Sequence, residues 1–278
     1  MIDFYKLSGA GNDFVALVEP DRLPTAAEIR AWCRRGVSLG ADGVFVLTRS
    51  DGAADMAHFN ADGARAELCL NGSRCAARLA FELGWGRDGS IEVRTDAGTL
   101  VARRAGGDAI EIELPAIVGE PEPRTLGVDS RHFEGWYLRV GVPHWVLPWT
   151  GSLATAPVSE LGPVFRAHPD FGPDGANADF VRFVSDHRIE VRTWERGVEA
   201  ETLACGTGVV ASVAAGIAAG RLGPPVTALT AGGFEIRVDG DAVEGRLRRP
   251  SFSGDARVLA RGEIRDGAAS LPRPASWT

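Results

Sequence analysis

The stretch that begins at Leu203 reads Leu-Ala-Cys205-Gly-Thr-Gly208-Val-Val-Ala-Ser-Val, a cysteine followed by glycines and an apolar run. An earlier stretch, from Leu68, reads Leu-Cys69-Leu-Asn-Gly72-Ser-Arg-Cys75-Ala-Ala and has the same layout. Each pattern predicts a helix that starts directly after its leading cysteine. A thiol at a helix N-terminus meets partial positive charge and exposed N–H groups, so we expect a pKa lowered toward neutrality for both Cys69 and Cys205.

Strand patterns surround both predicted helices in the same order. In the first half they cover residues 3–7, 14–18, 43–48 and 56–60 before the helix, and 90–95, 98–103 and 109–114 after it. In the second half they cover 136–140, 145–147, 178–184 and 188–194 before the helix, and 226–230, 234–238 and 242–247 after it, with a late strand at 258–264. Short helices are expected at 26–35 and 159–165. This layout predicts an α/β protein of two similar domains related by a pseudo-two-fold, with the boundary near the proline-rich stretch 115–123.

Composition excludes several classes of partner. The 278 residues carry a formal net charge of −7, which argues against nucleic acid and anionic membrane surfaces as partners. The longest uncharged apolar stretch, 203–220, is rich in glycine and alanine and falls short of a bilayer span. Charged residues near Met1 disfavour an export signal, and the four cysteines form no CxxC pair, so we expect reduced thiols and a cytoplasmic location.

Two matched thiols indicate a chemistry of their own. One thiolate and one thiol can remove a proton from one face of a carbon and return it to the other. An α-carboxylate could be bound by the backbone amides of Leu70, Asn71, Gly206 and Thr207, which follow the two cysteines. No lysine stands out as a Schiff-base former, so no cofactor and no metal are expected. Most free cysteines are simply buried, and we expect that of Cys33 and Cys75.

Seven motifs resemble one family when they are taken together and in order. They are Gly11-Asn-Asp-Phe14, Phe59-Asn-Ala-Asp-Gly63, Cys69-x-Asn71-Gly72-x-Arg74-Cys75, Pro143-His144, Asn177-Ala178-x-Phe180, Glu195-Arg-Gly197 and Glu201-Thr202-x-x-Cys205-Gly-Thr-Gly208, where x is a position outside the motif. In this the chain resembles the diaminopimelate epimerases, cofactor-independent racemases that use two cysteines. The resemblance implies that each domain is a β-barrel-like sheet around its central helix. It also implies that the last strand returns to the first domain, so that residues 1–116 plus 257–270 form the Cys69 domain and 117–256 the Cys205 domain, with a loose tail at 271–278.

The same resemblance implies roles for the site residues. His144 and Glu195 correspond to the pair that tunes the thiols, and Glu195 would also hold the substrate ammonium. Arg196 would recognise the distal end of the substrate with Asn60 and Asn177, and Asn12 would line the pocket. From the residues alone, other interpretations stay open: a core or turn histidine for His144, a surface ion pair for Glu195 and Arg196, and turn formation for Asn60 and Asn12.

Four positions depart from the family pattern. Leu70 stands where a glycine is usual, Val142 where many members have asparagine, and Gly43 where some have glutamine, and the segment around Glu199 is one residue longer. These changes concern substrate recognition and leave the thiol pair intact.

The leading hypothesis is therefore epimerisation of L,L-diaminopimelate to the meso form, an isomerase step for lysine and peptidoglycan synthesis. A racemase of histidine or proline on the same scaffold is one alternative, and a non-catalytic small-molecule-binding paralogue is another. The expected partner is a small amino-acid substrate, without nucleic acid or membrane, and a homodimer stays open.

Overall fold

The computed structural model describes residues 1–66, 68–114 and 119–269. The chain divides into two compact units, residues 1–110 with 256–278, and residues 111–255. The boundary between the units falls within the strand β8 (Ala109–Glu113), which pairs with β17 (Arg246–Asp255). Residues 115–118 of the predicted boundary region and the predicted tail at 271–278 lie outside the described residues.

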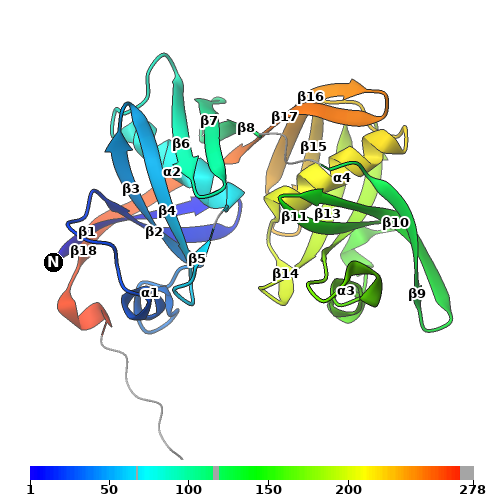
Figure 1. Ribbon diagram of the computed structural model, residues 1–278, viewed down its shortest axis with the longest axis horizontal. Helices are drawn as coiled ribbons and strands as arrows, with labels where there is room; N and C mark the ends of the chain where they lie inside the picture. The colour runs from blue at the N-terminus through cyan, green and yellow to red at the C-terminus, as the bar shows by residue number, and fades with distance from the viewer. Residues whose placement is uncertain (67, 115–118, 270–278) are drawn as a thin grey trace, which may run out of the picture. The chain divides into compact units, whose positions relative to one another are not determined.

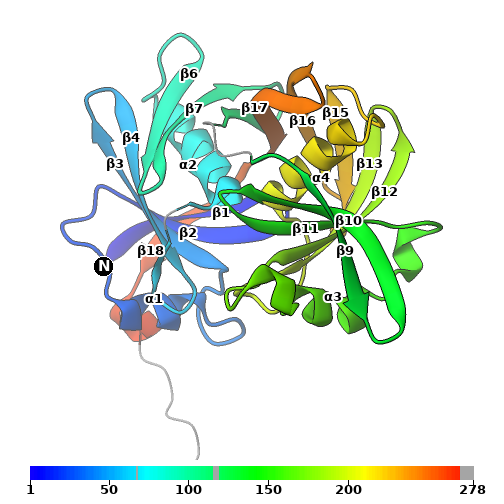
Figure 2. The ribbon, with the colours of Figure 1, turned by 45° about the vertical axis from the view of Figure 1, so that its right-hand side comes forward.

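The first unit holds all the strands before β8 and the last strand of the chain. Its elements are β1 (Ile2–Gly9), β2 (Asn12–Val18), α1 (Ala26–Cys33), β3 (Gly43–Ser50), β4 (Ala53–Asn60), β5 (Arg65–Ala66), α2 (Leu70–Glu82), β6 (Ser90–Thr95), β7 (Gly98–Arg104), β18 (Arg257–Ile264) and the turn η3 (Asp266–Ala269). Its strands pair in the order β18–β1–β2–β3–β4–β6–β7, and the pairs β2–β3 and β4–β6 are parallel. Figure 2 shows β18 beside β1, although they lie at opposite ends of the chain.

The second unit repeats this plan. Its elements are β9 (Glu122–Val128), β10 (Arg131–Val140), β11 (Val142–Pro148), η1 (Leu153–Thr155), α3 (Val158–Arg166), η2 (Pro169–Phe171), β12 (Asn177–Ser185), β13 (Arg188–Glu195), β14 (Ala200–Thr202), α4 (Gly206–Ala218), β15 (Val226–Thr230), β16 (Glu235–Val243) and β17. The strands pair in the order β9–β10–β11–β12–β13–β15–β16–β17. The third and fifth pairs in this order, β11–β12 and β13–β15, are parallel, as are the third and fifth pairs of the first unit. The prediction of two similar α/β domains is confirmed.

Each sheet has a long helix on one face and a short helix on the other. The helix α2 contacts β1, β2, β3, β4, β6, β7 and β18, and α4 contacts β10, β11, β12, β13, β16 and β17 (Figure 1). On the opposite faces, Ile29 and Trp32 of α1 belong to one buried apolar cluster with Val15 of β2, and the ring of Phe165 in α3 lies 6.0 Å from that of Phe180 in β12. The apolar character of α4 on all sides is explained by these strands, because they surround it. Among the described strands neither sheet closes on itself, so each is barrel-like and open.

Two strand predictions are wrong in instructive ways. The segments 234–238 and 242–247 were expected to be separate strands, but β16 runs without a break to Val243. A register shift between Asp239 and Asp241 marks a bulge at Gly240, and the chain reverses at Glu244 and Gly245, which both have positive φ. The strand β9 was not expected beside prolines. It pairs with β10 alone among the described strands, and an edge strand tolerates proline.

Candidate active site

Cys69 caps the N-terminus of α2, as its sequence pattern predicts. Its Sγ accepts a hydrogen bond from the backbone N–H of Gly72 at 3.4 Å, and its carbonyl accepts one from the N–H of Ser73 at 2.8 Å. Leu70 and Asn71 are the first two residues of the helix, and both are buried. Because the first N–H groups of a helix have no partner within the helix, this turn can bind an anion beside the thiol.

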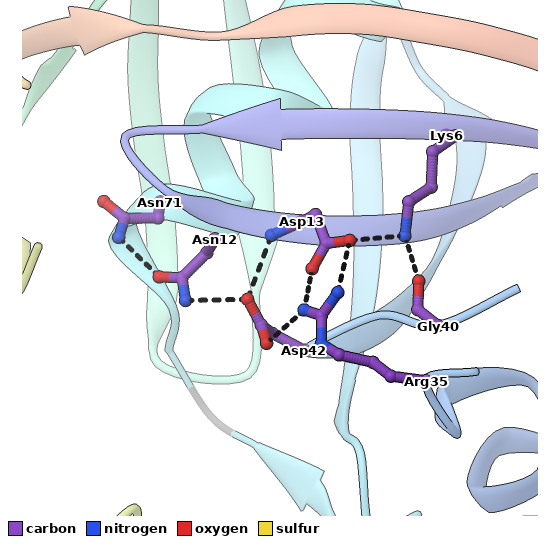
Figure 3. Close-up of polar contacts among 7 residues, drawn as sticks. All are labelled: Lys6, Asn12, Asp13, Arg35, Gly40, Asp42 and Asn71. Carbon is purple, nitrogen blue, oxygen red and sulfur yellow. Dashed lines mark hydrogen bonds and ion pairs between the residues drawn. The ribbon is translucent and has the colours of Figure 1, made fainter. Parts of the chain in front are cut away.

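A chain of polar contacts joins the start of α2 to the strand β2 (Figure 3). Asn71 donates its Nδ2 to Oδ1 of Asn12 at 2.7 Å, and Asn12 donates its own Nδ2 to Oδ2 of Asp42 at 3.1 Å. An ionised carboxylate can only accept, so Asp42 determines which way the Asn12 amide faces. The structure therefore brings the predicted residues Asn12 and Asn71 into direct contact next to Cys69.

Charged side chains hold the outer end of this network. Arg35 binds both Asp13 and Asp42, and Lys6 forms an ion pair with Asp13 at 2.7 Å. Burial acts to raise the pKa of Asp13, but hydrogen bonds from Arg35 and Lys6 outweigh it and hold that pKa below its ordinary value. This part of the network is half-exposed, with Arg35 at 60% side-chain exposure. Charge at the surface thus orders the amides that lie at the helix start.

The predicted residue Asn60 lies at the end of β4 and is exposed. Its N–H donates to the carbonyl of Ala64 and its carbonyl accepts from the N–H of Gly63, both at 2.9 Å. Asn60 therefore closes a tight turn, which is the interpretation that the sequence left open beside a binding role. Gly43 lies opposite Asn60 on β3, where a Cβ would come within 2.7 Å of the Phe59 carbonyl. Packing explains the glycine at that position.

Cys205 caps the N-terminus of α4, and Gly206 and Thr207 form its first turn. Its Sγ lies 3.4 Å from the Thr207 hydroxyl, and the cysteine is only 7% exposed. The prediction of a lowered pKa is wrong for this thiol. Burial raises the pKa of Cys205 well above its ordinary value, and the negative charges of Glu195 and Asp179 raise it further. The helix terminus is outweighed because desolvation and two carboxylates all favour the neutral thiol.

His144 lies on β11 and is completely buried in a polar network that the sequence predicted only in part. Its Nδ1 lies 2.7 Å from Oδ2 of Asp179, and its Nε2 lies 3.4 Å from Nδ2 of Asn177. Oδ1 of Asp179 accepts from the Thr193 hydroxyl at 2.7 Å. The prediction missed Asp179 and Thr193. The available signal was a carboxylate among the apolar residues Ala178, Phe180 and Val181.

Asn177 links this network to the segment that carries Glu195 and Arg196. Its Oδ1 accepts a hydrogen bond from the backbone N–H of Arg196 at 2.7 Å. Glu195 ends β13 and acts electrostatically on Cys205. The structure therefore gathers His144, Asn177, Arg196 and Glu195 within the unit that carries Cys205.

The extra residue near Glu199 forms a turn that is tied down outside this network. Glu199 has a positive φ of 57°, and its carboxylate accepts from the Gly197 N–H at 3.0 Å and from Nε of Arg166 at 2.8 Å. Arg166 belongs to α3, on the outer face of the sheet.

Cys33 and Cys75 are both buried as predicted, and burial raises the pKa of Cys33 to about 11. Within the described residues, no group of three or more histidine, cysteine or acidic side chains has the arrangement of a metal site.

Comparison with known proteins agrees with this arrangement. A family model described as diaminopimelate epimerase matches residues 4–110 and 136–248. The chain belongs to the diaminopimelate epimerase family. It is 36% identical to the diaminopimelate epimerase of Aquifex aeolicus (strain VF5), over 86% of this chain and 90% of that protein. It is also 36% identical to the enzyme of the same name from Methanothrix thermoacetophila, over 95% of this chain and 96% of the relative.

A solved structure extends the likeness in fold beyond this family. The crystal structure of a probable proline racemase from Agrobacterium radiobacter K84 matches with a TM-score of 0.70 at 16% identity, over 98% of this chain and 96% of that one. Membership of the diaminopimelate epimerase family makes the protein an isomerase that acts on a small molecule. Among the described helices, none combines the length and the apolar character of a bilayer-spanning helix.

Proposed function

We propose that the protein inverts one stereocentre of L,L-2,6-diaminopimelate to give the meso isomer, with Cys69 and Cys205 as the two proton-transfer groups. The observation that carries this proposal is the equivalence of the two cysteines. Each is the N-cap of a buried 13-residue helix in one of two units with the same strand pairing. A racemase that works without an electron-sink cofactor needs two such groups, one for each face of the carbon.

In the proposed reaction one cysteine acts as thiolate and the other as thiol. The thiolate takes the α-proton and becomes a thiol, while the opposite thiol gives its proton to the other face of the same carbon and becomes a thiolate. The raised pKa of Cys205 favours its protonated form before substrate binds. The roles are exchanged in the reverse reaction.

Backbone amides supply the electrostatic stabilisation that the weakly acidic α-proton requires. The N–H groups of Leu70, Asn71, Gly206 and Thr207 would bind the α-carboxylate, where negative charge develops during proton removal. Leucine at position 70 keeps its amide, since Leu70 is the first residue of α2. The replacement of glycine therefore preserves the donor.

The remaining residues recognise the rest of the substrate. Glu195 would hold the reacting ammonium group, and Arg196 would bind the distal carboxylate by charge-assisted hydrogen bonds, with Asn177 and Asn60 on the distal amine. Asn12 would reach the substrate from the Asn71 side of the Cys69 helix. His144 and Glu195 would tune the thiols. Two thiols that must stay reduced fit the cytoplasm.

The test is proton NMR in D2O under reducing conditions, with L,L-diaminopimelate, histidine and proline as substrates. We expect loss of the α-proton with inversion for diaminopimelate alone. Cys69→Ala and Cys205→Ala should each reduce turnover by at least about 1,000-fold, because each removes one of the two proton-transfer groups. Cys33→Ala is the matched control, since Cys33 is a buried cysteine of α1, and should keep full activity.

Two results would contradict the proposal. One is full turnover in either of the two alanine variants. The other is exchange of histidine or proline but not of diaminopimelate, which would keep the two-thiol chemistry and change the substrate. Arg196→Met separates the substrates further, because it should abolish activity only if a charged distal group is bound.

A further inference from the structure

A fully buried carboxylate lies in the second unit beneath the helix that Cys205 begins. Asp179 is 0% exposed and sits between Ala178 and Phe180 on the central strand β12. A Cβ on Gly208, in the first turn of α4, would overlap Oδ1 of Asp179. Glycine at position 208 thus lets the helix start pack directly on the carboxylate. An ionised group in such surroundings persists only when its oxygens are fully hydrogen-bonded.

The hydrogen bonds of Asp179 determine which atoms of its neighbours donate and which accept. Its Oδ1 accepts from the Thr193 hydroxyl and its Oδ2 from the His144 ring, both at 2.7 Å. Because the carboxylate can only accept, Nδ1 of His144 carries a proton. Nε2 of His144 faces the Nδ2 group of Asn177 at 3.4 Å, and since that group can only donate, Nε2 is the acceptor.

The orientation of His144 also determines the orientation of the Asn177 amide, which contacts the backbone of Arg196. Since its Nδ2 faces His144, its Oδ1 faces the other way and accepts from the N–H of Arg196 at 2.7 Å. The chain of contacts thus runs from β13 through β12 and β11 to the segment after Glu195. Reversal of the His144 tautomer would place two donors against each other at Asn177, and its amide would have to turn away from Arg196.

We propose that Asp179 is a positioning residue for the reaction: it fixes the tautomer of His144 and, through the Asn177 amide, the place of the Glu195–Arg196 segment. This rests on the proposed function, in which Glu195 and Arg196 bind substrate. Asp179 itself does not touch the substrate. Carboxylates orient imidazoles in this way in metal centres, where the loss of such a partner costs roughly 10- to 100-fold in activity.

Asp179→Asn separates this role from packing. The variant has the same shape, and its amide can still accept from His144 with one end while it donates to the Thr193 hydroxyl with the other. It can equally turn round and donate to His144, which selects the opposite tautomer. The variant should therefore keep the fold, but it no longer selects a single tautomer of His144. Thr193→Val is the matched control. It removes the hydroxyl that donates to Oδ1 of Asp179, and it leaves the carboxylate oxygen that accepts from His144 in place.

The experiment combines 15N NMR of the histidine rings with steady-state kinetics on L,L-diaminopimelate. The His144 signals are assigned by their absence in His144→Gln. We expect the Nδ1–H tautomer in the wild-type protein and in Thr193→Val, and a mixture of tautomers in Asp179→Asn. We expect kcat/KM to fall by roughly 10- to 100-fold in Asp179→Asn, with a raised KM, and by less in Thr193→Val.

Several results would overturn the role of Asp179. An Nε2–H tautomer or an imidazolium at His144 in the wild-type protein would do so without any variant. Wild-type kcat/KM in Asp179→Asn would do so as well, whatever the tautomer. Failure of the proposed function looks different, because the wild-type protein would then leave the α-proton of diaminopimelate unexchanged while its His144 tautomer could still be measured.

Discussion

The two units carry their cysteine-led helices over strands with the same pairing, yet the side chains at matching positions differ. In the first unit Phe14 pairs in register with Gly43, and Phe45 pairs with His58. In the second unit His144 pairs in register with Asn177, and Asp179 pairs with Thr193. When the two units are aligned by strand register, three aromatic residues of the first unit occupy the positions of three polar residues of the second. The aromatic group is Phe14, Phe45 and His58, and the polar group is His144, Asp179 and Thr193.

The aromatic group of the first unit has no internal hydrogen bonds. The Phe14 ring lies 6.1 Å from that of Phe45 and 5.8 Å, edge to face, from that of His58. His58 is 6% exposed, and neither ring nitrogen has a partner among the described residues. Burial lowers the pKa of His58 to about 4. The polar group of the second unit, in contrast, is joined by two hydrogen bonds to Asp179.

The comparison teaches that topology places these positions but does not determine their chemistry. The same strand pairs accommodate either a neutral, aromatic layer or a buried carboxylate. The polar group lies in the same unit as Cys205, and the carboxylate of Asp179 contributes to the raised pKa of that thiol. The two thiols therefore differ in their surroundings even though their helices are equivalent.

The largest expected effect comes from making the second unit resemble the first at one position. His144→Phe would leave Asp179 buried without its imidazole partner. We expect the free energy of unfolding to fall by about 3 kcal/mol or more, because a buried carboxylate loses one of its two hydrogen-bond donors and the cost of leaving a buried group unsatisfied is larger for a charged group. Urea unfolding followed by tryptophan fluorescence measures this. Replacing both residues, as His144→Phe with Asp179→Leu, should recover much of the loss, and a single variant as stable as wild type would contradict the comparison.

A second expected effect is that His58 makes the stability of the protein depend on pH in the acidic range. Its pKa is about 4 in the folded protein, compared with about 6.5 when exposed. Between these values the unfolded chain binds a proton that the folded protein excludes, so stability falls as pH falls from about 6.5 to 4. The loss amounts to about 3 kcal/mol, since one pKa unit corresponds to about 1.4 kcal/mol.

His58→Leu isolates this contribution. At pH 7 we expect the variant to match or slightly exceed the wild-type stability, because it removes a buried polar group without a protein partner. Its free energy of unfolding should then decline less steeply than that of wild type between pH 6.5 and 4. Parallel curves for the two proteins would show that His58 is not kept neutral by burial.

The smallest effect is expected at the surface network of the first unit. Asp42→Asn weakens the contact with Arg35 in a half-exposed region, so the free energy of unfolding should change by less than about 1 kcal/mol. The difference should vanish in about 1 M salt, where charges are screened within about 3 Å. A loss as large as that of His144→Phe, or one that persists in salt, would show that this network resembles the buried one.

The sequence predicted what depends on neighbouring residues. Both helices begin after Cys69 and Cys205 because the glycine and small-residue pattern there is a local signal. The bulge at Gly240 was mistaken for a turn, since the same residue permits either conformation and only the pairing with β17 decides between them. Asp179 was overlooked because its importance depends on His144 and Thr193, which lie on other strands.

The sequence by itself determined the family, the repeated order of strands and helices, and the two cysteines at the helix starts, because these follow from motifs and periodicity along the chain. Only the tertiary structure decided that Cys205 is desolvated beside two carboxylates, that Asp42 orders Asn12, and that His58 lacks the partners that His144 has. Burial, charge and hydrogen bonding between strands depend on which residues meet in space, and that is settled by the packing of the sheet around its helix.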